Sequence, residues 1–190
     1  GGSIRIPSSA CGVFGLKPTC GRVSHYPVPN AWSQYGVTGP MARTVRDAAL
    51  LLGVIAGHDP RDPMSFPAPA EDYVARLDGD LRGLRIAWSP DLGYARLHPE
   101  VRRLTTVAAN VFTDLGATVE ESAPGFERPT EAFMSLFTVS YAARIAQYLP
   151  ARRAEIDPYL TKLVEQGLRT SAVDYVRALE VSTRLHLTMV

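Results

Sequence analysis

The chain opens with a serine that follows two glycines, Gly1-Gly2-Ser3. Glycine has no Cβ atom and tolerates unusual dihedral angles, so the backbone beside it can approach a substrate closely. Consecutive N–H groups in such a loop can point together at one anion. Acyl transfer needs this arrangement, because a nucleophilic hydroxyl must lie next to donors for the tetrahedral oxyanion. The tripeptide alone is also typical of ordinary turns, so it predicts little without its context.

The residues that follow make the pattern specific. Residues 1–19 read GGSIRIPSSACGVFGLKPT, and the pattern continues in Gly21-Arg22-Val23-Ser24, in residues 39–51 and in residues 56–63. This string resembles the second half of the amidase signature, so the chain is similar to members of the amidase signature family. The resemblance is dense up to residue 63 of 190 and much weaker beyond it.

The resemblance implies that Ser3 is the nucleophile, which attacks an amide carbonyl and forms an acyl-enzyme that water hydrolyses. It also implies an oxyanion hole made by backbone N–H groups of Gly1, Gly2 and Ser3. In the family, a second serine on a cis peptide bond passes the proton of the nucleophile to a neutral lysine. Both residues precede the nucleophile, so we expect this chain to begin within the fold and to be inactive alone. No metal or organic cofactor is expected.

Other polar residues near Ser3 are assigned different roles. Arg5 is expected to anchor the loop through hydrogen bonds, with contact to an anionic substrate group as the alternative. Lys17 is not expected to be the general base, because the family's lysine precedes the serine and the resemblance gives Lys17 a structural role. Ser8 and Ser9 are expected at a helix start and in packing.

Histidines and cysteines show no spacing typical of a metal site or a redox pair. Cys11 and Cys20 are not in a CxxC pattern, so we expect two free, buried thiols in a reducing compartment. A Ser-His-Asp triad with Ser3 would lack the GxSxG elbow. We interpret the histidines as surface or hydrogen-bonded polar residues. They are His25, His58, His98 and His186.

The elements that must hold the serine loop follow from periodicity and turn residues. Short apolar runs such as residues 13–16 predict buried strands joined by tight turns. Thr44 and Asp47 have a spacing similar to a capping box, and the apolar run over residues 48–55 predicts a largely buried helix that stops at Gly57. Proline-rich turns over residues 59–63 and 67–69 follow this helix.

A second group of elements lies beyond these turns. The pattern predicts a strand over residues 84–88, a helix over about 98–115 and a strand over 117–121, which together form a βαβ unit. Helices are expected over residues 130–149, 156–167 and 171–190, the last with Ser171 and Asp174 at capping-box spacing. Apolar residues of the first of these helices are expected in the core, with an acyl pocket as the alternative. They are Phe133, Leu136, Phe137, Tyr141 and Tyr148.

These observations predict an α/β fold. The resemblance implies the amidase signature fold, a mixed sheet flanked by helices. We expect residues 1–190 to be part of a single domain of this kind, with a signature core over residues 1–63 and a more variable α/β and helical region over residues 64–190.

Composition limits the classes of partner. The chain is 46% hydrophobic and 21% charged, and its 20 basic and 19 acidic side chains give a net charge of +1. This balance provides no basic face for nucleic acid. No apolar run is long enough to span a membrane, and no signal sequence opens the chain, so we expect a cytoplasmic enzyme.

Three functions stay open. The first is hydrolysis of a small-molecule carboxamide to carboxylate and ammonia or an amine. The second is that of the GatA-type component of glutamyl-tRNA amidotransferase, which works with partner subunits; a serine-leucine-aspartate stretch usual in that component is replaced here around residues 34–38. The third is a non-catalytic binding or scaffold fragment whose amides hold an anion. A homo-oligomer is compatible with any of them.

Overall fold

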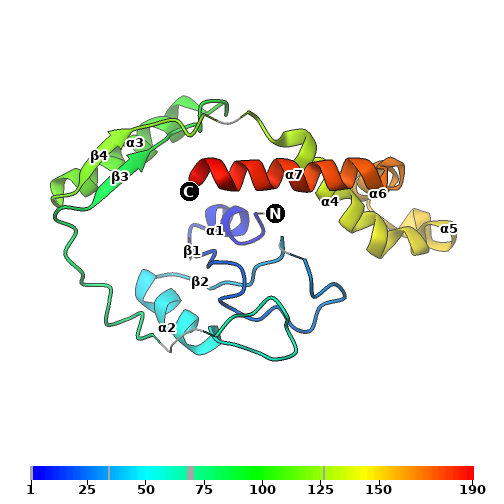
Figure 1. The fold of residues 1–190 in the computed structure, drawn as a ribbon, viewed down its shortest axis with the longest axis horizontal. Helices are drawn as coiled ribbons and strands as arrows, with labels where there is room; N and C mark the ends of the chain where they lie inside the picture. The colour runs from blue at the N-terminus through cyan, green and yellow to red at the C-terminus, as the bar shows by residue number, and fades with distance from the viewer. Residues whose placement is uncertain (1, 34, 68–70, 126) are drawn as a thin grey trace. The chain divides into compact units, whose positions relative to one another are not determined.

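The computed structural model describes residues 2–33, 35–67, 71–125 and 127–190. Contacts within the chain group it into two compact units, Gly1–Asp80 and Leu81–Val190, and the order of their elements can be followed in Figure 1. The units are described separately below. The predicted division after residue 63 concerned family pattern and stays a prediction.

The first unit is built on a short helix and a pair of very short strands. Helix α1 spans Arg5–Cys11. Strands β1 (Phe14–Gly15) and β2 (Met41–Ala42) pair antiparallel, with Gly15 opposite Met41. The strand predicted over residues 13–16 is therefore present, but its predicted burial is wrong, because Phe14 is exposed and its neighbours are only half-buried.

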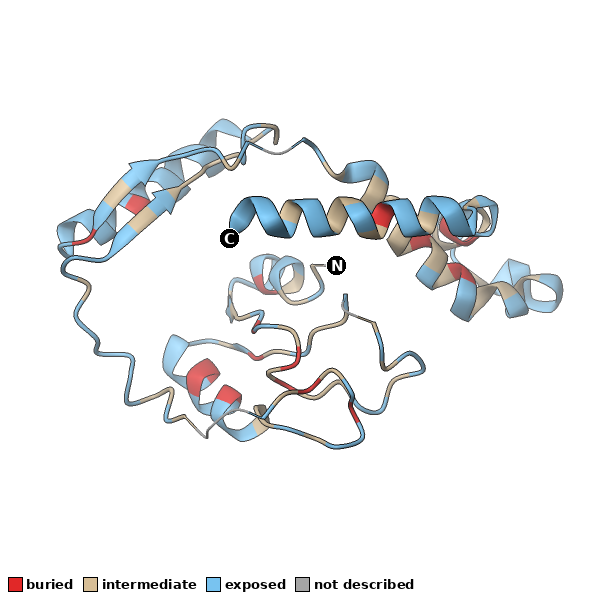
Figure 2. Ribbon diagram, in the orientation of Figure 1, coloured by how far each residue is buried: buried red, intermediate tan, exposed pale blue. Residues whose placement is uncertain are grey.

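Helix α2 spans Val45–Ile55 and begins as predicted. The Thr44 hydroxyl accepts a hydrogen bond from the N–H of Asp47 at 3.1 Å, which satisfies one of the unpaired donors of the first turn. Only one face of the helix is buried, as Figure 2 shows. Leu50 and Val54 on the other face are 61% and 75% exposed. The prediction of a largely buried helix is wrong, since the first unit covers only the face that carries small residues.

The second unit begins with the predicted βαβ arrangement. Strand β3 (Arg85–Trp88) and strand β4 (Thr118–Glu121) are parallel and are joined by helix α3 (Pro99–Asp114). The register places Arg85 opposite Thr118. A parallel pair needs a crossover connection of this length, so the pattern of the sequence and the topology agree. The predicted α/β class is confirmed; the described strands form one antiparallel and one parallel pair.

Helices make up the rest of the second unit, and the three predicted helical stretches are confirmed with shifted bounds. The N-cap of the last helix is confirmed as well, since Ser171 Oγ accepts the N–H of Asp174 at 3.0 Å. In order, the elements are α4 (Thr130–Ile145), η1 (Ala146–Tyr148), α5 (Leu149–Arg152), η2 (Arg153–Glu155), α6 (Pro158–Arg169) and α7 (Ala172–Met189).

Small residues set the packing of α4 against α6. Thr138 of α4 and Val164 of α6 are completely buried. A Cβ atom at Gly167 would lie 2.9 Å from the Cβ of Ala142 and 2.5 Å from the carbonyl carbon of Thr138. Gly167 therefore lets the two helix backbones approach each other closely. The sequence pattern placed the end of the helix at this glycine, but α6 continues to Arg169.

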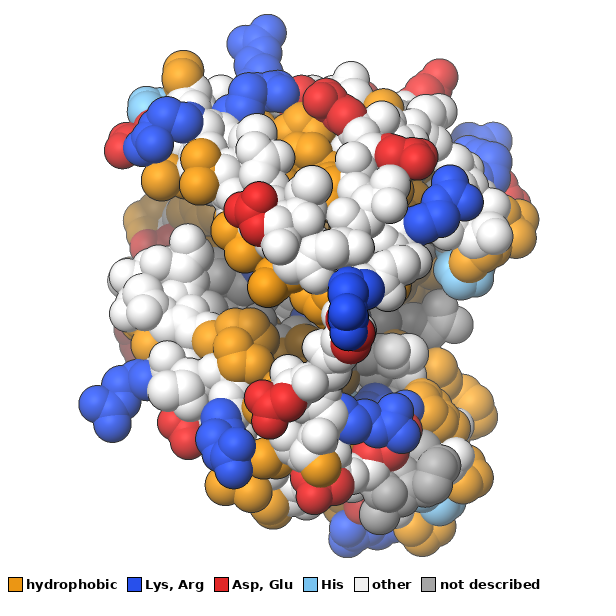
Figure 3. Space-filling view, turned by 90° about the vertical axis from the view of Figure 1, so that its left-hand side faces the viewer, with side chains coloured by type: hydrophobic (Ala, Val, Ile, Leu, Met, Phe, Trp, Pro, Cys, Tyr) orange, Lys and Arg blue, Asp and Glu red, His pale blue; other side chains and the backbone are white. Residues whose placement is uncertain are grey.

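Large apolar side chains reach the surface in both units. Val45 and Leu51 of α2 are exposed, as are Leu104 and Val107 of α3. Figure 3 shows one face on which hydrophobic side chains alternate with charged ones. Among the described residues, no helix combines the length and apolar character needed to cross a membrane.

Candidate active site

Ser3 lies in a turn directly before α1, and its side chain is exposed. Gly2 has a φ of 101°, in the left-handed region that favours glycine. The N–H of Ile6 donates to the carbonyl of Gly2 at 2.8 Å, which closes the turn around Ser3. A glycine-dependent turn therefore holds the predicted nucleophile at the surface of the first unit.

Two of the three predicted oxyanion-hole donors can be described. Gly1 lies outside the described residues. Within the described part of the chain, the N–H groups of Gly2 and Ser3 donate no hydrogen bond to the protein. Both donors are thus available to an oxygen atom that the protein does not supply.

Arg5 and Lys17 differ in their contacts. Arg5 is the first residue of α1 and is exposed. Its guanidinium makes no hydrogen bond or ion pair with the residues that the structure describes, so both the anchoring role and the substrate contact stay predictions. The ammonium group of Lys17 donates to the carbonyl of Pro18 at 2.8 Å.

Ser8 and Ser9 lie in the second half of α1 and not at its start, so that part of the prediction is wrong. Ser8 is buried, and its hydroxyl donates to the carbonyl of Ile4 at 2.7 Å. Ser9 is exposed. The packing role expected of these serines is therefore found at Ser8 alone.

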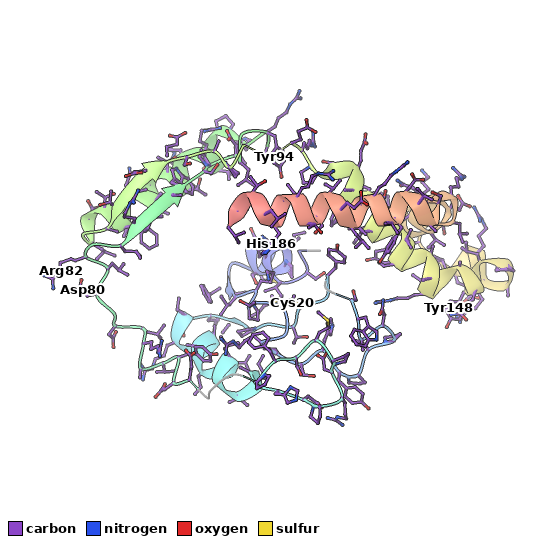
Figure 4. All side chains as sticks on the ribbon, in the orientation of Figure 1. Cys20, Asp80, Arg82, Tyr94, Tyr148 and His186 are labelled. Atoms are coloured by element: carbon purple, nitrogen blue, oxygen red, sulfur yellow. The ribbon has the colours of Figure 1, made fainter. Side chains whose placement is uncertain are left out.

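The prediction of two buried thiols is half wrong. Both cysteines are free, but Cys11 is exposed and Cys20, labelled in Figure 4, is half-buried. Cys11 is the last residue of α1, a helix whose one buried residue is Ser8. Its thiol therefore lies on the solvent side of this short helix.

Histidines serve local hydrogen bonds. Nδ1 of His58 lies 3.0 Å from Oγ of Ser65, and Nδ1 of His98 accepts the N–H of Glu100 at the start of α3 at 3.3 Å. His186 lies on α7 (Figure 4). No group of three or more His, Cys, Asp or Glu side chains that could hold a metal ion occurs within the described ranges.

A buried carboxylate that sequence reasoning missed fixes the loop after α2. Asp62 is 3% exposed, and its two oxygens accept the backbone N–H groups of His25 at 2.7 Å and Met64 at 2.9 Å. These hydrogen bonds, that of His25 first, lower the pKa of Asp62, although burial acts in the opposite direction. Only the repeated Asp-Pro pair, Asp59-Pro60 and Asp62-Pro63, marked this segment in the sequence.

The same loop carries an exposed ion pair. The guanidinium of Arg61 donates to the carboxylate of Asp59 and lowers the pKa of Asp59 to about 2. Arg61 also lies over the ring of Tyr26, with 4.2 Å between the guanidinium carbon and the ring centroid. Residues 59–62 are thereby tied to the segment that holds Tyr26.

The apolar residues of α4 are not the core that was predicted. Phe133 is 43% exposed, and Tyr148 of η1 is 47% exposed. Phe137 and Tyr141 are half-buried, and Phe137 stacks on Phe133 with 5.2 Å between ring centroids and meets Tyr141 edge-on at 4.8 Å. Leu136 is half-buried too. The reason is that close packing against α6 uses the small residues of α4, which leaves the aromatic row on another side.

A hollow of about 390 Å³ lies within the second unit. It contains none of the predicted catalytic residues, but Tyr148, labelled in Figure 4, is part of its wall. Its lining combines apolar and charged side chains, and the Arg152–Glu155 ion pair, with 2.6 Å between its atoms, stands at its edge. The complete lining is Ile145, Tyr148, Arg152, Glu155, Ile156, Asp157 and Leu160.

Comparison with known proteins decides the family. The sequence profile of the amidase family matches residues 1–184. The chain belongs to the amidase family.

Individual amidase-family proteins match over most of the chain. An acylamidase from Rhodococcus erythropolis is 38% identical over 179 residues, which is 93% of this chain and 38% of the relative. The A-type subunit of the glutamyl-tRNA(Gln) amidotransferase of Chloroflexus aggregans is 44% identical over 149 residues, 78% of this chain and 30% of that protein. The crystal structure of a bacterial aryl acylamidase of the amidase signature family matches with a TM-score of 0.91 and 30% identity, over 100% of this chain and 41% of that one.

The amidase fold expected from the sequence is thus confirmed. The chain spans less than half the length of each of these three relatives.

Proposed function

We propose that the whole protein is an amidase that hydrolyses a carboxylic amide through an acyl-enzyme on Ser3. The observation that carries the proposal is the turn at Ser3, which combines an exposed hydroxyl with the unpaired N–H groups of Gly2 and Ser3 in an amidase-family chain. In this mechanism the Ser3 oxygen attacks the amide carbon, and the two N–H groups donate to the oxyanion. The amine leaves with a proton, and water then releases the carboxylate.

The activating groups in this proposal are the cis-serine and the lysine implied by the family resemblance, with Gly1 as a further oxyanion donor. A serine hydroxyl needs such a base, because its free pKa makes it a weak nucleophile. Arg5, exposed at the start of α1, is proposed as a loop anchor or as a contact for an anionic substrate group.

The relatives suggest the kind of amide. Two of the three compared proteins are named an acylamidase and an aryl acylamidase. We therefore propose an N-acyl or aryl amide as substrate, with the row of Phe133, Phe137 and Tyr141 as a candidate wall for its apolar part.

A second candidate is the corresponding component of a glutamyl-tRNA amidotransferase, which would assemble with further subunits. The 44% identity to the Chloroflexus aggregans amidotransferase protein favours it. The departure from the pattern of that component around residues 34–38 argues for the acylamidase. A cytoplasmic location suits either function, because both thiols are free.

The test is covalent labelling of the protein at its natural full length with a fluorophosphonate probe, with the modified peptide identified by mass spectrometry. Labelling is expected at Ser3 and absent in Ser3→Ala, which should also lose hydrolysis by on the order of 10⁴-fold or more. Ser9→Ala, an exposed serine of α1, is the matched control. A folded protein without label at Ser3 would point to the non-catalytic binding fragment.

Substrate assays separate the two enzymatic candidates. Ammonia release from glutamine is compared with amine release from an aryl amide such as an acyl anilide. Faster turnover of the anilide supports the acylamidase. Turnover of glutamine alone, increased by added partner subunits of the amidotransferase, would replace it with the second candidate.

A further inference from the structure

A buried hydroxyl fixes the peptide group next to the proposed nucleophile. Ser8 is 4% exposed, and its Oγ donates to the carbonyl of Ile4 at 2.7 Å. The N–H of Ser8 donates to the same oxygen at 3.1 Å. Two donors from one residue therefore hold the carbonyl of Ile4, the residue that directly follows Ser3. Rotation of this peptide plane would break both hydrogen bonds.

Two glycines make room for this arrangement. We call Gly15 of β1 and Gly39, which precedes β2, the glycine floor. A Cβ atom at Gly15 would lie 2.8 Å from Cβ of Ser8, closer still to its Oγ, and 3.2 Å from Cγ2 of Ile4. A Cβ atom at Gly39 would lie 3.0 Å from Cδ1 of Ile4. Side chains are therefore excluded at both positions by the two residues that hold the serine turn.

The glycine floor is itself fixed by backbone hydrogen bonds. Gly15 is paired with Met41 across β1 and β2. The N–H of Leu16 donates to the carbonyl of Pro40 at 3.0 Å, which joins the two residues that directly follow the glycines. The first turn of α1 thus rests on a surface whose position is set by strand pairing and not by flexible side chains.

We propose that Ser8 and the glycine floor position Ser3 for attack on the amide. The proposal rests on the proposed role of Ser3 as the nucleophile. Ser8 does not touch the reacting atoms; it acts through the backbone of Ile4. Reaction rates depend steeply on alignment, and a displacement of about 1 Å can cost about 10²-fold. Loss of the contact should therefore lower kcat and leave KM nearly unchanged.

Four variants of the full-length protein test this role. Gly15→Ala inserts the excluded Cβ and is expected to slow Ser3 labelling by about 10²-fold. Ser8→Ala removes the hydroxyl without adding an atom and should slow labelling about tenfold, with KM within about twofold of the parent. Ser9→Ala makes the same chemical change on the exposed side of α1 and should have no effect.

The fourth variant is a rescue. Gly15→Ala combined with Ser8→Gly removes the Ser8 atoms that the new Cβ would meet. It should regain at least about tenfold of the lost labelling rate, although glycine weakens the helix. A merely structural defect at Gly15 would not be repaired by a second destabilising change.

Hydrogen exchange of the peptide that covers residues 2–11 accompanies each rate. It should speed up in Gly15→Ala, because the amides of Ile6 and Ser8 lose their fixed acceptors. Parent-like labelling in both folded Gly15→Ala and folded Ser8→Ala would overturn the positioning role. Ser8→Ala decides alone if Gly15→Ala does not fold. No labelling of the unsubstituted protein would instead overturn the proposed function of Ser3.

Discussion

The serine turn of the first unit and the α4–α6 pair of the second unit both depend on glycine, but in different ways. Gly15 and Gly39 make room for the side chains of a turn between strands of two residues each. Gly167 makes room for the backbone of a neighbouring helix. The first arrangement is non-periodic and local, whereas the second lies inside a regular helical pattern. Similar substitutions should therefore have different consequences in the two units.

The largest effect on stability is expected at the helix contact. Gly167→Ala would place a methyl group against the backbone of Thr138. Overpacking of this kind costs about 1–3 kcal/mol, and a backbone neighbour cannot turn aside, so we expect a value near the upper end. Hydrogen exchange at α4 and α6 measures it.

Gly53→Ala in α2 is the matched control for this prediction. The nearest atom to a Cβ there is Cδ2 of Tyr73 at 3.9 Å, an ordinary contact. Alanine is favoured over glycine inside a helix by about 1 kcal/mol, so exchange in α2 should slow down. Equal destabilisation by both substitutions would contradict the close approach at Gly167.

The second unit also shows what periodicity can predict. The strand–helix–strand pattern and the three helical stretches followed from apolar spacing and from caps such as Ser171. The burial of each helix face did not follow, because it depends on which neighbour is present. Phe133 has an apolar side chain at a helical spacing, yet it is exposed, since Thr138 and Ala142 occupy the contact with α6.

A somewhat smaller effect is expected at the buried carboxylate of the first unit. Asp62→Ala would leave the N–H groups of His25 and Met64 without their acceptor. An unsatisfied buried donor costs about 1–3 kcal/mol, so a loss of about 2 kcal/mol is expected. Exchange in residues 21–26 and 62–66 should increase while α6 is unchanged. Equal changes in both units would show that the loop is not a local feature of the first unit.

The same residue predicts acid sensitivity. The folded pKa of Asp62 is lowered, so this carboxylate stabilises the folded state above its unfolded pKa of about 3.9. The stabilisation is lost as the pH falls through the folded pKa. Exchange in residues 21–26 should therefore rise more between pH 6 and pH 3 in the parent than in Asp62→Ala. An identical pH response in the two proteins would contradict this assignment.

The serine turn could be predicted from the sequence only in part. The family resemblance assigned Ser3 its role, and the structure adds the positive φ of Gly2 and the exposure of Ser3. The resemblance could not assign the buried hydrogen bond of Ser8, because its acceptor and the glycine floor come together only in three dimensions. The network around Asp62 was missed for the same reason, since its donor at His25 lies 37 residues away in the sequence.

The smallest effects are expected at two helix caps, one in each unit, and they are the closest comparison that the chain offers. Thr44 Oγ1 and Ser171 Oγ each accept the N–H of an aspartate three residues later, at 3.1 and 3.0 Å. Thr44→Ala and Ser171→Ala should each cost about 1 kcal/mol, seen as faster exchange in the first turn of α2 or α7. Ser171 also donates to the carboxylate of Asp174 at 2.6 Å, so its loss should be the larger. A larger effect at Thr44 would mean that α2, with one apolar face exposed, relies more on its cap than the better packed α7.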